Sequence, residues 1–443
     1  MQHRKLPVAA IQPLAHDRRD FERAWPRILA SVERAGAEGA RLIVLPEATV
    51  PGYVLGREAV AREQLAGAAH DLCERAQRYG ATIVYGAAKI DGGVTLNAAI
   101  AIGPGGRELG FSAKQFLWHF DRLWFAPGAT LQPVDTPAGK LGLLVCADGR
   151  IPSIAATLVE RGAELLVMPT AWVTSGRDPD ALENVQADLM VNVRARENGV
   201  AFVAANKAGT ELGSVAYCGK STLVDANGRT VARASEREAE IVFGELEIAG
   251  SERPAAPAFA APEQRSSDRR PPVRLAFTPA RDARERADLD FLARQADAEA
   301  VLGPADADCE SGGRTLEVAG IRMAAIAPRT FHSPRGMIAA RLAGIDLFLC
   351  APGGDPAWHV PFARTRAAEL RAYVVIFADG ERAFAVDPDG AVAAGTFGSY
   401  RVASFAYDAA RAAATEVAPF TDVLRGAQNA EAIRERTSAL LAP

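Results

Sequence analysis

Three residues in the first third of the chain have reactive side chains and lie in or directly after an apolar run. Glu47 follows the run RLIVLP, Lys114 lies in the aromatic segment FSAKQFLWHFDRLWFAPG, and Cys146 closes the run KLGLLVC. Functional side chains of open α/β sheets gather outside the carboxyl ends of strands. There a carboxylate can act as a general base, and a cysteine near a helix N-terminus and a cation would have a lowered pKa and act as a nucleophile.

Each of these residues also has an ordinary interpretation, and the single motifs leave both open. Glu47 could be an exposed loop carboxylate, Lys114 a solvated head group on a buried stem, and Cys146 inert packing. Lysine is scarce, however, since six lysines stand against 44 arginines and none follows Lys220. Lysine carries a compact charge, and its pKa shifts on burial, whereas arginine stays charged. A lysine in a chain that mostly uses arginine, such as Lys114, is therefore a candidate functional residue.

The composition of the 443 residues narrows the class of protein. The 50 basic and 54 acidic side chains give a formal net charge of −4, which argues against nucleic-acid binding, and 49% hydrophobic residues argue against disorder. No apolar run reaches about 18 residues, and the start does not resemble a signal peptide. Five scattered cysteines and six unclustered histidines predict neither a disulfide framework nor a metal site. We therefore expect a cytoplasmic enzyme that binds neither nucleic acid nor membranes.

Short apolar runs alternate with helical patterns along the first half, which predicts α/β layering. The segment STLVDANGRTVARA predicts two strands around an Asn-Gly turn. Helices are expected over residues 19–38, 57–79, 152–162 and 180–198, and strands over PVAAIQ, RLIVLPE, ATIVYGAAK, NAAIAIGPGG, KLGLLVCAD, AELLVMPT and VAFVAANKAG.

The second half repeats these patterns after a segment rich in Pro, Ala and Ser. GIRMAAIAP follows the pattern of KLGLLVCAD, LAGIDLFLCAP that of ERGAELLVMPT, and VDPDGAVAAG that of VDANGRTVARA, in the same order. A repeat of this length predicts a duplicated domain. We expect a catalytic domain over residues 1–248, a linker over 249–272, a shortened copy over 273–408 and a helical tail over 409–443.

In combination, the motifs resemble the nitrilase (carbon–nitrogen hydrolase) superfamily. The resemblance rests on LPEATVPGY, a lysine upstream of WFAPG, VCADGRIP, GAELLVMPTAW, RARENGVAFVAANKAG and CGKSTLVDANGR, in this order over residues 6–246. It implies a four-layer αββα sandwich and no metal or organic cofactor. It also implies that Cys146 forms a thioester with an amide substrate and that Glu47 moves the protons. Lys114 and the backbone N–H of Ala147 would stabilise the oxyanion.

The sequence departs from the family pattern at two positions after the lysine. Asp121 stands where the family usually has a second glutamate, one methylene longer. The shorter side chain predicts that the backbone moves inward, that a water bridges the gap, or that a larger substrate fills it. Phe116 replaces a common histidine, which makes the expected pocket less polar.

The triplet Cys146-Ala147-Asp148 resembles the amidase and carbamoylase branches more than the Cys-Trp-Glu of nitrilases. We therefore expect hydrolysis of a small amide or carbamoyl compound. A nitrilase, an acyl transferase and a non-catalytic binding or scaffold protein remain alternatives. Selectivity is expected from the loops 52–66, 115–127 and 172–186, with pocket candidates Tyr53, Trp118, Trp124 and Trp172, whereas Asp148 and Arg150 are expected to fix the turn.

The second copy retains the apolar pattern but not the reactive residues. By alignment, Ala305 falls opposite Glu47 and Ile326 opposite Cys146, no lysine is present, and Cys350 is expected to be packing. Members of the resembled family commonly pack sandwich against sandwich. We therefore expect the copy to take a partner's place within the chain as a pseudo-dimer, with further homo-oligomerisation left open.

Overall fold

The computed structural model describes residues 4–56, 59–176, 180–248, 271–379, 381–397 and 401–441. Of the expected linker, residues 249–270 lie outside this description. The expected domain boundaries and the pseudo-dimer stay predictions. Contacts divide the chain into two compact units, the first made of Met1–Arg253, Ala418–Thr421 and Gln428–Pro443, the second of Pro254–Val417 and Asp422–Ala427.

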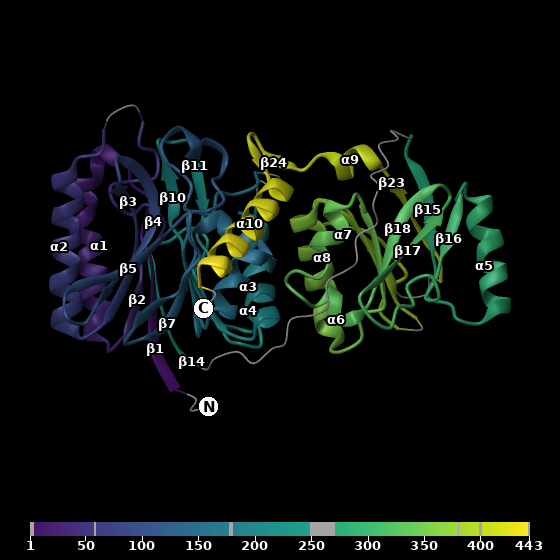
Figure 1. Ribbon diagram of the computed structural model, residues 1–443, viewed down its shortest axis with the longest axis horizontal. Coiled ribbons are helices and arrows are strands. Elements are labelled where there is room, and N and C mark those ends of the chain that lie inside the picture. The colour runs from purple at the N-terminus through teal and green to yellow at the C-terminus, as the bar shows by residue number, and fades with distance from the viewer. Residues whose placement is uncertain are drawn as a thin grey trace. The chain divides into compact units, whose positions relative to one another are not determined.

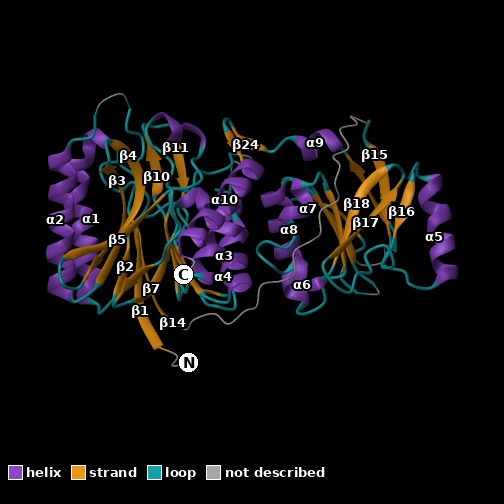
Figure 2. Cartoon of the chain, viewed as in Figure 1, coloured by secondary structure: helices purple, strands orange, loops and turns teal. Residues whose placement is uncertain are grey.

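The first unit is an αββα sandwich, as the sequence led us to expect (Figures 1 and 2). Its two middle layers are six-stranded sheets. One has the order β14-β1-β2-β3-β4-β5, formed by Glu240–Ile248, Arg4–Gln12, Leu42–Val44, Thr82–Asp91, Val94–Gly103 and Arg107–Ala113. The other has the order β13-β12-β9-β8-β7-β6, formed by Thr230–Arg233, Thr222–Val224, Ala201–Ala205, Leu165–Pro169, Gly139–Leu143 and Val134–Thr136.

Helices form the two outer layers of this unit (Figure 1). α1 (Phe21–Ala37) and α2 (Arg62–Tyr79) cover the first sheet, and α3 (Pro152–Glu160) and α4 (Val191–Asn198) cover the second. Helical spacing places the apolar residues of α1 on one buried stripe, which is the reason this segment forms an amphipathic helix. The buried residues of that stripe are Phe21, Trp25, Ile28, Leu29, Val32 and Ala35.

Local hydrogen bonding moves two expected boundaries. The helix expected over 180–198 begins at the π-helical turn Gln186–Met190, because the side chain of Asn184 accepts the backbone N–H groups of Gln186 and Ala187 at 2.9 and 3.3 Å. Strand β7 ends at Leu143. Cys146 therefore does not end a strand but opens a 3₁₀ turn.

The second unit has a complete sheet and a short one. Helix α5 (Ala283–Gln295) covers the short sheet, and α6 (Pro328–Phe331), α7 (Ile338–Leu342) and α8 (His359–Leu370) cover the other (Figure 1). The short sheet has the order β16-β15-β23, formed by Ala300–Leu302, Val273–Phe277 and Ala403–Tyr407. The complete sheet runs β17-β18-β19-β20-β21-β22, formed by Gly313–Val318, Ile321–Ile326, Leu347–Cys350, Tyr373–Phe377, Ala383–Val386 and Val392–Gly395.

Matching arginine contacts in the two units correct the position expected opposite the cysteine. Arg194 donates to the carbonyl of Gly149, and Arg366, at the equivalent place in the second unit, donates to the carbonyl of Phe331. Gly149 lies three residues after Cys146, so the equivalent of Cys146 is three residues before Phe331. This position is Pro328, not Ile326.

Strand pairing keeps Ala305 opposite Glu47. Ala9 pairs with Ile43 and packs with residues of α1 and α2, and Ala276 pairs with Val301 and packs with Ala293 of α5, so both pairs face an outer helix layer. Counting four residues onward from Ile43 and from Val301 places Ala305 opposite Glu47.

The segment after residue 408 is more varied than the expected helical tail. It contains α9 (Ala409–Ala413), the short strands β24 (Glu416–Ala418) and β25 (Thr421–Asp422), and α10 (Val423–Leu441). None of the helices in the described residues is long and apolar enough to cross a membrane.

Candidate active site

Glu47 lies at the turn that follows β2, inside the first unit. Its backbone N–H donates to the carbonyl of Thr170 at 3.2 Å, and its side chain is fully buried. The next residue, Ala48, has a φ of 42°, a left-handed conformation that costs a non-glycine residue about 1–3 kcal/mol. Gly86 of β3 permits the close approach, because a Cβ there would lie 2.4 Å from the Cα of Glu47.

Lys114 directly follows β5 and reaches the same buried point. Its backbone N–H donates to the carbonyl of Asn97 at 2.8 Å. Its Nζ lies 2.7 Å from Oε1 of Glu47 and 2.6 Å from Oδ2 of Asp121. All three ionic side chains have no exposed surface. Burial lowers the pKa of Lys114, but the charges of Asp121 and Glu47 outweigh it and raise the pKa well above its ordinary value.

Asp121 contacts the lysine directly despite its shorter side chain. It lies in the 3₁₀ turn His119–Leu123, where its Oδ2 accepts the N–H of Trp118 at 2.8 Å and its Oδ1 accepts the hydroxyl of Tyr53 at 2.7 Å. Neither a bridging water nor a larger substrate is needed to span a gap. The contact fits an inward position of the backbone among the three expected arrangements.

The carboxylate of Glu47 presents two different oxygens. Oε1 accepts from Lys114 and, at 2.7 Å, from Nδ2 of Asn97. Oε2 is buried and has no hydrogen-bond partner in the structure. A buried carboxylate oxygen without a donor can accept a proton from a nearby acid. Sequence reasoning missed Asn97, although a polar residue in the apolar run NAAIAI could have marked it.

Cys146 occupies the first position of the 3₁₀ turn Cys146–Arg150 and is 6% exposed. Its φ of 45° is again left-handed, so backbone strain lies beside the thiol as it does beside Glu47. Our expectation of a lowered pKa was wrong. Burial and the charge of Glu47 raise the thiol pKa to about 12, although Lys114 opposes the shift. The resting residue is therefore a thiol that needs a base.

Asp148 joins the cysteine turn to the segment after Lys114. Its Oδ1 accepts the N–H groups of Gln115 at 3.0 Å and Phe116 at 2.8 Å, and its Oδ2 accepts that of Val145 at 3.0 Å. Burial raises its pKa to about 7 against the opposing effect of these donors. Asp148 therefore fixes the turn, as expected.

A second buried ion pair, also missed from the sequence, holds the loop after Glu47. Nζ of Lys207 lies 3.3 Å from the carbonyl of Ala48 and 3.7 Å from Oε2 of Glu211. Oε1 of Glu211 accepts the N–H of Val54 at 2.7 Å. The pair thus contacts both ends of the loop from Ala48 to Val54, which also carries Tyr53.

The expected pocket residues have different surroundings. Tyr53 is buried and bonded to Asp121, so it supports the ion cluster. Trp118 is partly buried, with the guanidinium of Arg150 4.7 Å from its ring centre. Trp124 is partly buried and packs edge-on against Phe120.

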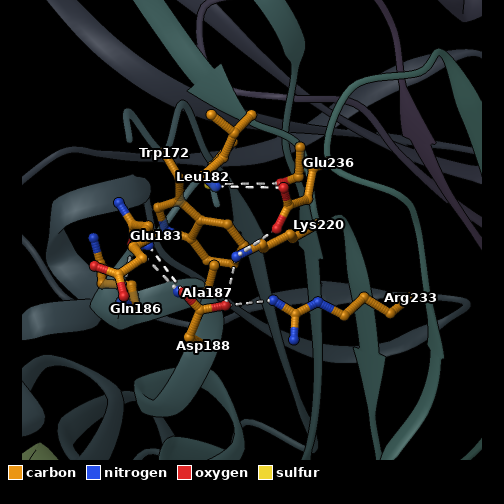
Figure 3. A network of polar contacts seen from close by, with 12 residues as sticks. Trp172, Leu182, Glu183, Gln186, Ala187, Asp188, Lys220, Arg233 and Glu236 are labelled. Carbon is orange, nitrogen blue, oxygen red and sulfur yellow. Dashed lines mark hydrogen bonds and ion pairs between the residues drawn. The ribbon is translucent and has the colours of Figure 1, made fainter. Parts of the chain in front are cut away.

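Trp172 is 1% exposed, and its indole N–H has no hydrogen-bond partner in the structure. Figure 3 draws Trp172 together with the charged residues Asp188, Lys220, Arg233 and Glu236. Lys220 pairs there with Asp188 at 2.8 Å and Glu236 at 3.2 Å. These ion pairs hold Asp188, which directly follows the expected selectivity loop 172–186. Residues 177–179 of this loop are not described.

Across the described part of the chain, no group of three or more His, Cys, Asp or Glu side chains is arranged to hold a metal ion. The ionic cluster of Glu47, Lys114 and Asp121 instead contains its own cation. Together with the cysteine turn, it offers a nucleophile, a free carboxylate oxygen and a fixed positive charge.

Comparisons with known proteins agree with this chemistry. The sequence model of the carbon–nitrogen hydrolase family matches residues 7–253. The nitrilase of Pyrococcus abyssi is 30% identical over 227 residues, which cover 49% of this chain and 80% of that protein. The (R)-stereoselective amidase of a Pseudomonas species is 30% identical over 210 residues, covering 47% of this chain and 73% of the relative.

Solved structures give the same result. An amidase from Nesterenkonia sp. is 26% identical and matches with a TM-score of 0.50, covering 55% of this chain and 90% of the amidase. A mutant of the amidase from Nesterenkonia sp. AN1 shows covalent addition of the acetamide moiety of fluoroacetamide at its active-site cysteine. The chain therefore belongs to the carbon–nitrogen hydrolase family and is an amidase-like hydrolase.

Proposed function

We propose that the protein hydrolyses the carbon–nitrogen bond of a small amide or carbamoyl compound through a thioester on Cys146. The observation that carries the proposal is the free Oε2 of Glu47. Lys114 and Asn97 occupy the other carboxylate oxygen, so this one is left to receive a proton. The elevated thiol pKa makes such a base necessary, because little thiolate exists near neutral pH.

The reaction divides into acylation and deacylation. In acylation, Cys146 transfers its thiol proton to Glu47 while Sγ attacks the carbonyl carbon. The resulting oxyanion is stabilised by Lys114 and the backbone N–H of Ala147, interactions that can be worth about 2.7–4 kcal/mol for one donor. The C–N bond then breaks, and Glu47 protonates the departing ammonia or amine.

Deacylation uses the same groups with water as the nucleophile. Glu47 removes a proton from the water, whose oxygen attacks the thioester carbonyl. The C–S bond breaks, the carboxylic acid leaves, and the proton returns from Glu47 to the sulfur of Cys146. Each residue thus ends the cycle in its starting protonation state.

Trapping of the acyl-enzyme tests the proposal. The wild-type protein is incubated with a panel of primary amides and N-carbamoyl compounds, quenched with acid and examined by intact-protein mass spectrometry. At least one compound should add its acyl mass to the wild type and none to Cys146→Ala. Glu47→Gln should lower the acylation rate by about 100-fold or more. Cys350→Ala, a buried cysteine of the second unit, is the matched control and should acylate normally.

The absence of any adduct and of any ammonia release across the panel would contradict the proposal and favour a binding or scaffold role. A nitrilase activity is the second candidate, because a relative at 30% identity is a nitrilase. Assaying a nitrile beside its amide separates the two, since an amidase releases ammonia only from the amide.

A further inference from the structure

The catalytic unit contains a short piece of chain from beyond the second unit. Residues Ala418–Thr421 and Gln428–Pro443 contact the first unit closely enough to be part of it, although about 160 residues of the second unit precede them. We call residues 418–421 the return segment. Its last residue, Thr421, begins β25 and has no exposed surface.

The return segment makes a direct contact with the turn that carries Asp121. Oγ1 of Thr421 accepts the backbone N–H of His119 at 2.7 Å, and the same hydroxyl donates to the carbonyl of Pro419 at 3.3 Å. His119 is the first residue of the 3₁₀ turn and has a φ of 43°. A left-handed backbone conformation is strained and persists only where surrounding contacts hold it. The Thr421 hydroxyl provides such a contact by accepting the backbone N–H of His119.

From His119 the support continues to the ion cluster. The turn positions Asp121, which contacts Lys114 at 2.6 Å, and Lys114 in turn contacts Glu47 at 2.7 Å. A displacement of about 1 Å at a reacting group can cost about 100-fold in rate. The hydroxyl of Thr421 therefore binds the backbone two residues before Asp121, and the position of Lys114 depends on the side chain of Asp121.

The remainder of the tail anchors the return segment on its C-terminal side. The carboxylate of Asp422 caps α10 by accepting the N–H groups of Leu424 and Arg425 at 2.9 and 3.0 Å. Further along α10, Ile433 is buried and the carbonyl of Arg434 accepts from Arg161, just after α3, at 3.3 Å. The segment is thus fixed by a helix that packs on the catalytic unit.

We propose that Thr421 is a positioning residue of the active site and that the catalytic unit requires the return segment for full activity. The proposal rests on the role given above to Lys114. The second half of the chain would then matter for activity, because Thr421 follows it in the sequence and contacts the first unit.

Two substitutions of Thr421 test the contact. Thr421→Val keeps the shape but removes the acceptor, so kcat should fall about tenfold to 100-fold with a smaller change in KM. Thr421→Ser keeps the hydroxyl and should retain kcat within about twofold. Thr396→Val is the matched control, because the buried hydroxyl of Thr396 accepts the N–H of Ala383 at 2.9 Å in the second unit. This control should keep the wild-type kcat.

Assays are run well below the unfolding midpoint of each variant, so that loss of folded protein does not enter kcat. A folded Thr421→Val protein with wild-type kcat overturns the inference. If that variant does not fold, hydrogen–deuterium exchange of the wild type decides: the peptide containing His119 should show a protected amide at that residue, and exchange at the unprotected rate overturns the inference. Failure of the wild type to form any acyl-enzyme would instead contradict the proposed function, so the two failures are distinguishable.

Discussion

The two six-stranded sheets that begin with β6 and β17 are alike strand for strand. In each, an antiparallel strand precedes three parallel strands, and two antiparallel strands follow. Each sheet also has a shift of strand register between its last two strands, at Leu223/Val224 in one sheet and at Ala385/Val386 in the other. The other sheets differ: β16-β15-β23 matches β2-β1-β14, and among the described residues nothing continues it as β3, β4 and β5 do.

This difference separates residues that hold the fold from residues to which we assign a role in the proposed reaction. Arg194 pairs with Glu197 at 2.6 Å, and Arg366 pairs with Glu369 at 2.6 Å, with all four side chains buried. Because the pair is present in a unit without a cysteine or a lysine at the equivalent places, its function is structural. Lys114 follows β5, so loss of that edge of the sheet removes its support as well as the residue. We interpret the second unit as a duplicate that kept its packing and lost its chemistry.

The largest expected effect comes from breaking the arginine pair in either unit. Arg194→Met and Arg366→Met each remove the arginine of a buried ion pair, which should lower the free energy of unfolding by about 3–5 kcal/mol. Only Arg194→Met should also lower the activity of the folded protein, by about tenfold or more, since Arg194 holds the carbonyl of Gly149 in the cysteine turn. Urea unfolding and kcat measure the two effects. Equal loss of kcat in both variants would contradict a purely structural second unit.

Acid should destabilise the first unit through His16. Burial, and secondarily the charge of Lys207, lowers its pKa from 6.5 to about 4. Below pH 6.5 His16 of the unfolded chain therefore binds a proton, whereas His16 of the folded chain binds one only when the pH falls to about 4. The stability is fully present above pH 6.5 and falls by up to about 3 kcal/mol as the pH drops to about 4.

Urea unfolding of His16→Phe across this pH range checks the assignment to His16. The variant should lose part of the pH dependence, whereas His70→Asn, an exposed control on α2, should keep it. An unchanged slope in His16→Phe would show that other groups cause the acid sensitivity.

The smallest expected effects are at the two matching hairpins. Oδ1 of Asp225 accepts the N–H groups of Asn227 and Arg229, both at 2.8 Å, and Oδ1 of Asp387 accepts those of Asp389 and Ala391 at 2.9 and 3.0 Å. Asp225→Ala should cost about 1 kcal/mol of unfolding free energy, and Asp387→Ala roughly twice that, because Asp387 also pairs with Arg411 at 2.7 Å.

Thermal unfolding measures the hairpin variants, with Asp→Asn at each position as the control that keeps one acceptor oxygen. Neither alanine variant should change kcat. A larger cost at Asp225 than at Asp387 would contradict the account of the second hairpin.

Local pattern was enough to predict much of the first unit. The apolar stripe of α1, the alternation of strands and helices, and the hairpin at Asp225–Gly228 follow from short-range periodicity and turn chemistry. The resemblance then brought Glu47, Lys114 and Cys146 together as candidates, and the structure places Lys114 against Glu47.

Features made by distant contacts could not be predicted. The left-handed backbone at Ala48 and Cys146 depends on packing that no local pattern encodes. The elevated thiol pKa depends on burial among distant segments and on the nearby charge of Glu47, neither of which a sequence gives. The contact of Thr421 with His119 joins residues 302 positions apart, and the two-residue error opposite Cys146 arose because similar apolar runs can be aligned in more than one register.

The ion cluster around Lys114 has a consequence for the end of the proposed reaction. Two carboxylates share one ammonium in a space without exposed surface, so the cluster holds a surplus of negative charge. A neutral amide can approach it without electrostatic opposition, but the product acid is an anion near neutral pH and is repelled where screening by water is weak. The same charges that position the nucleophile's base thus help to expel the product, and the carboxylate product should be a weak inhibitor.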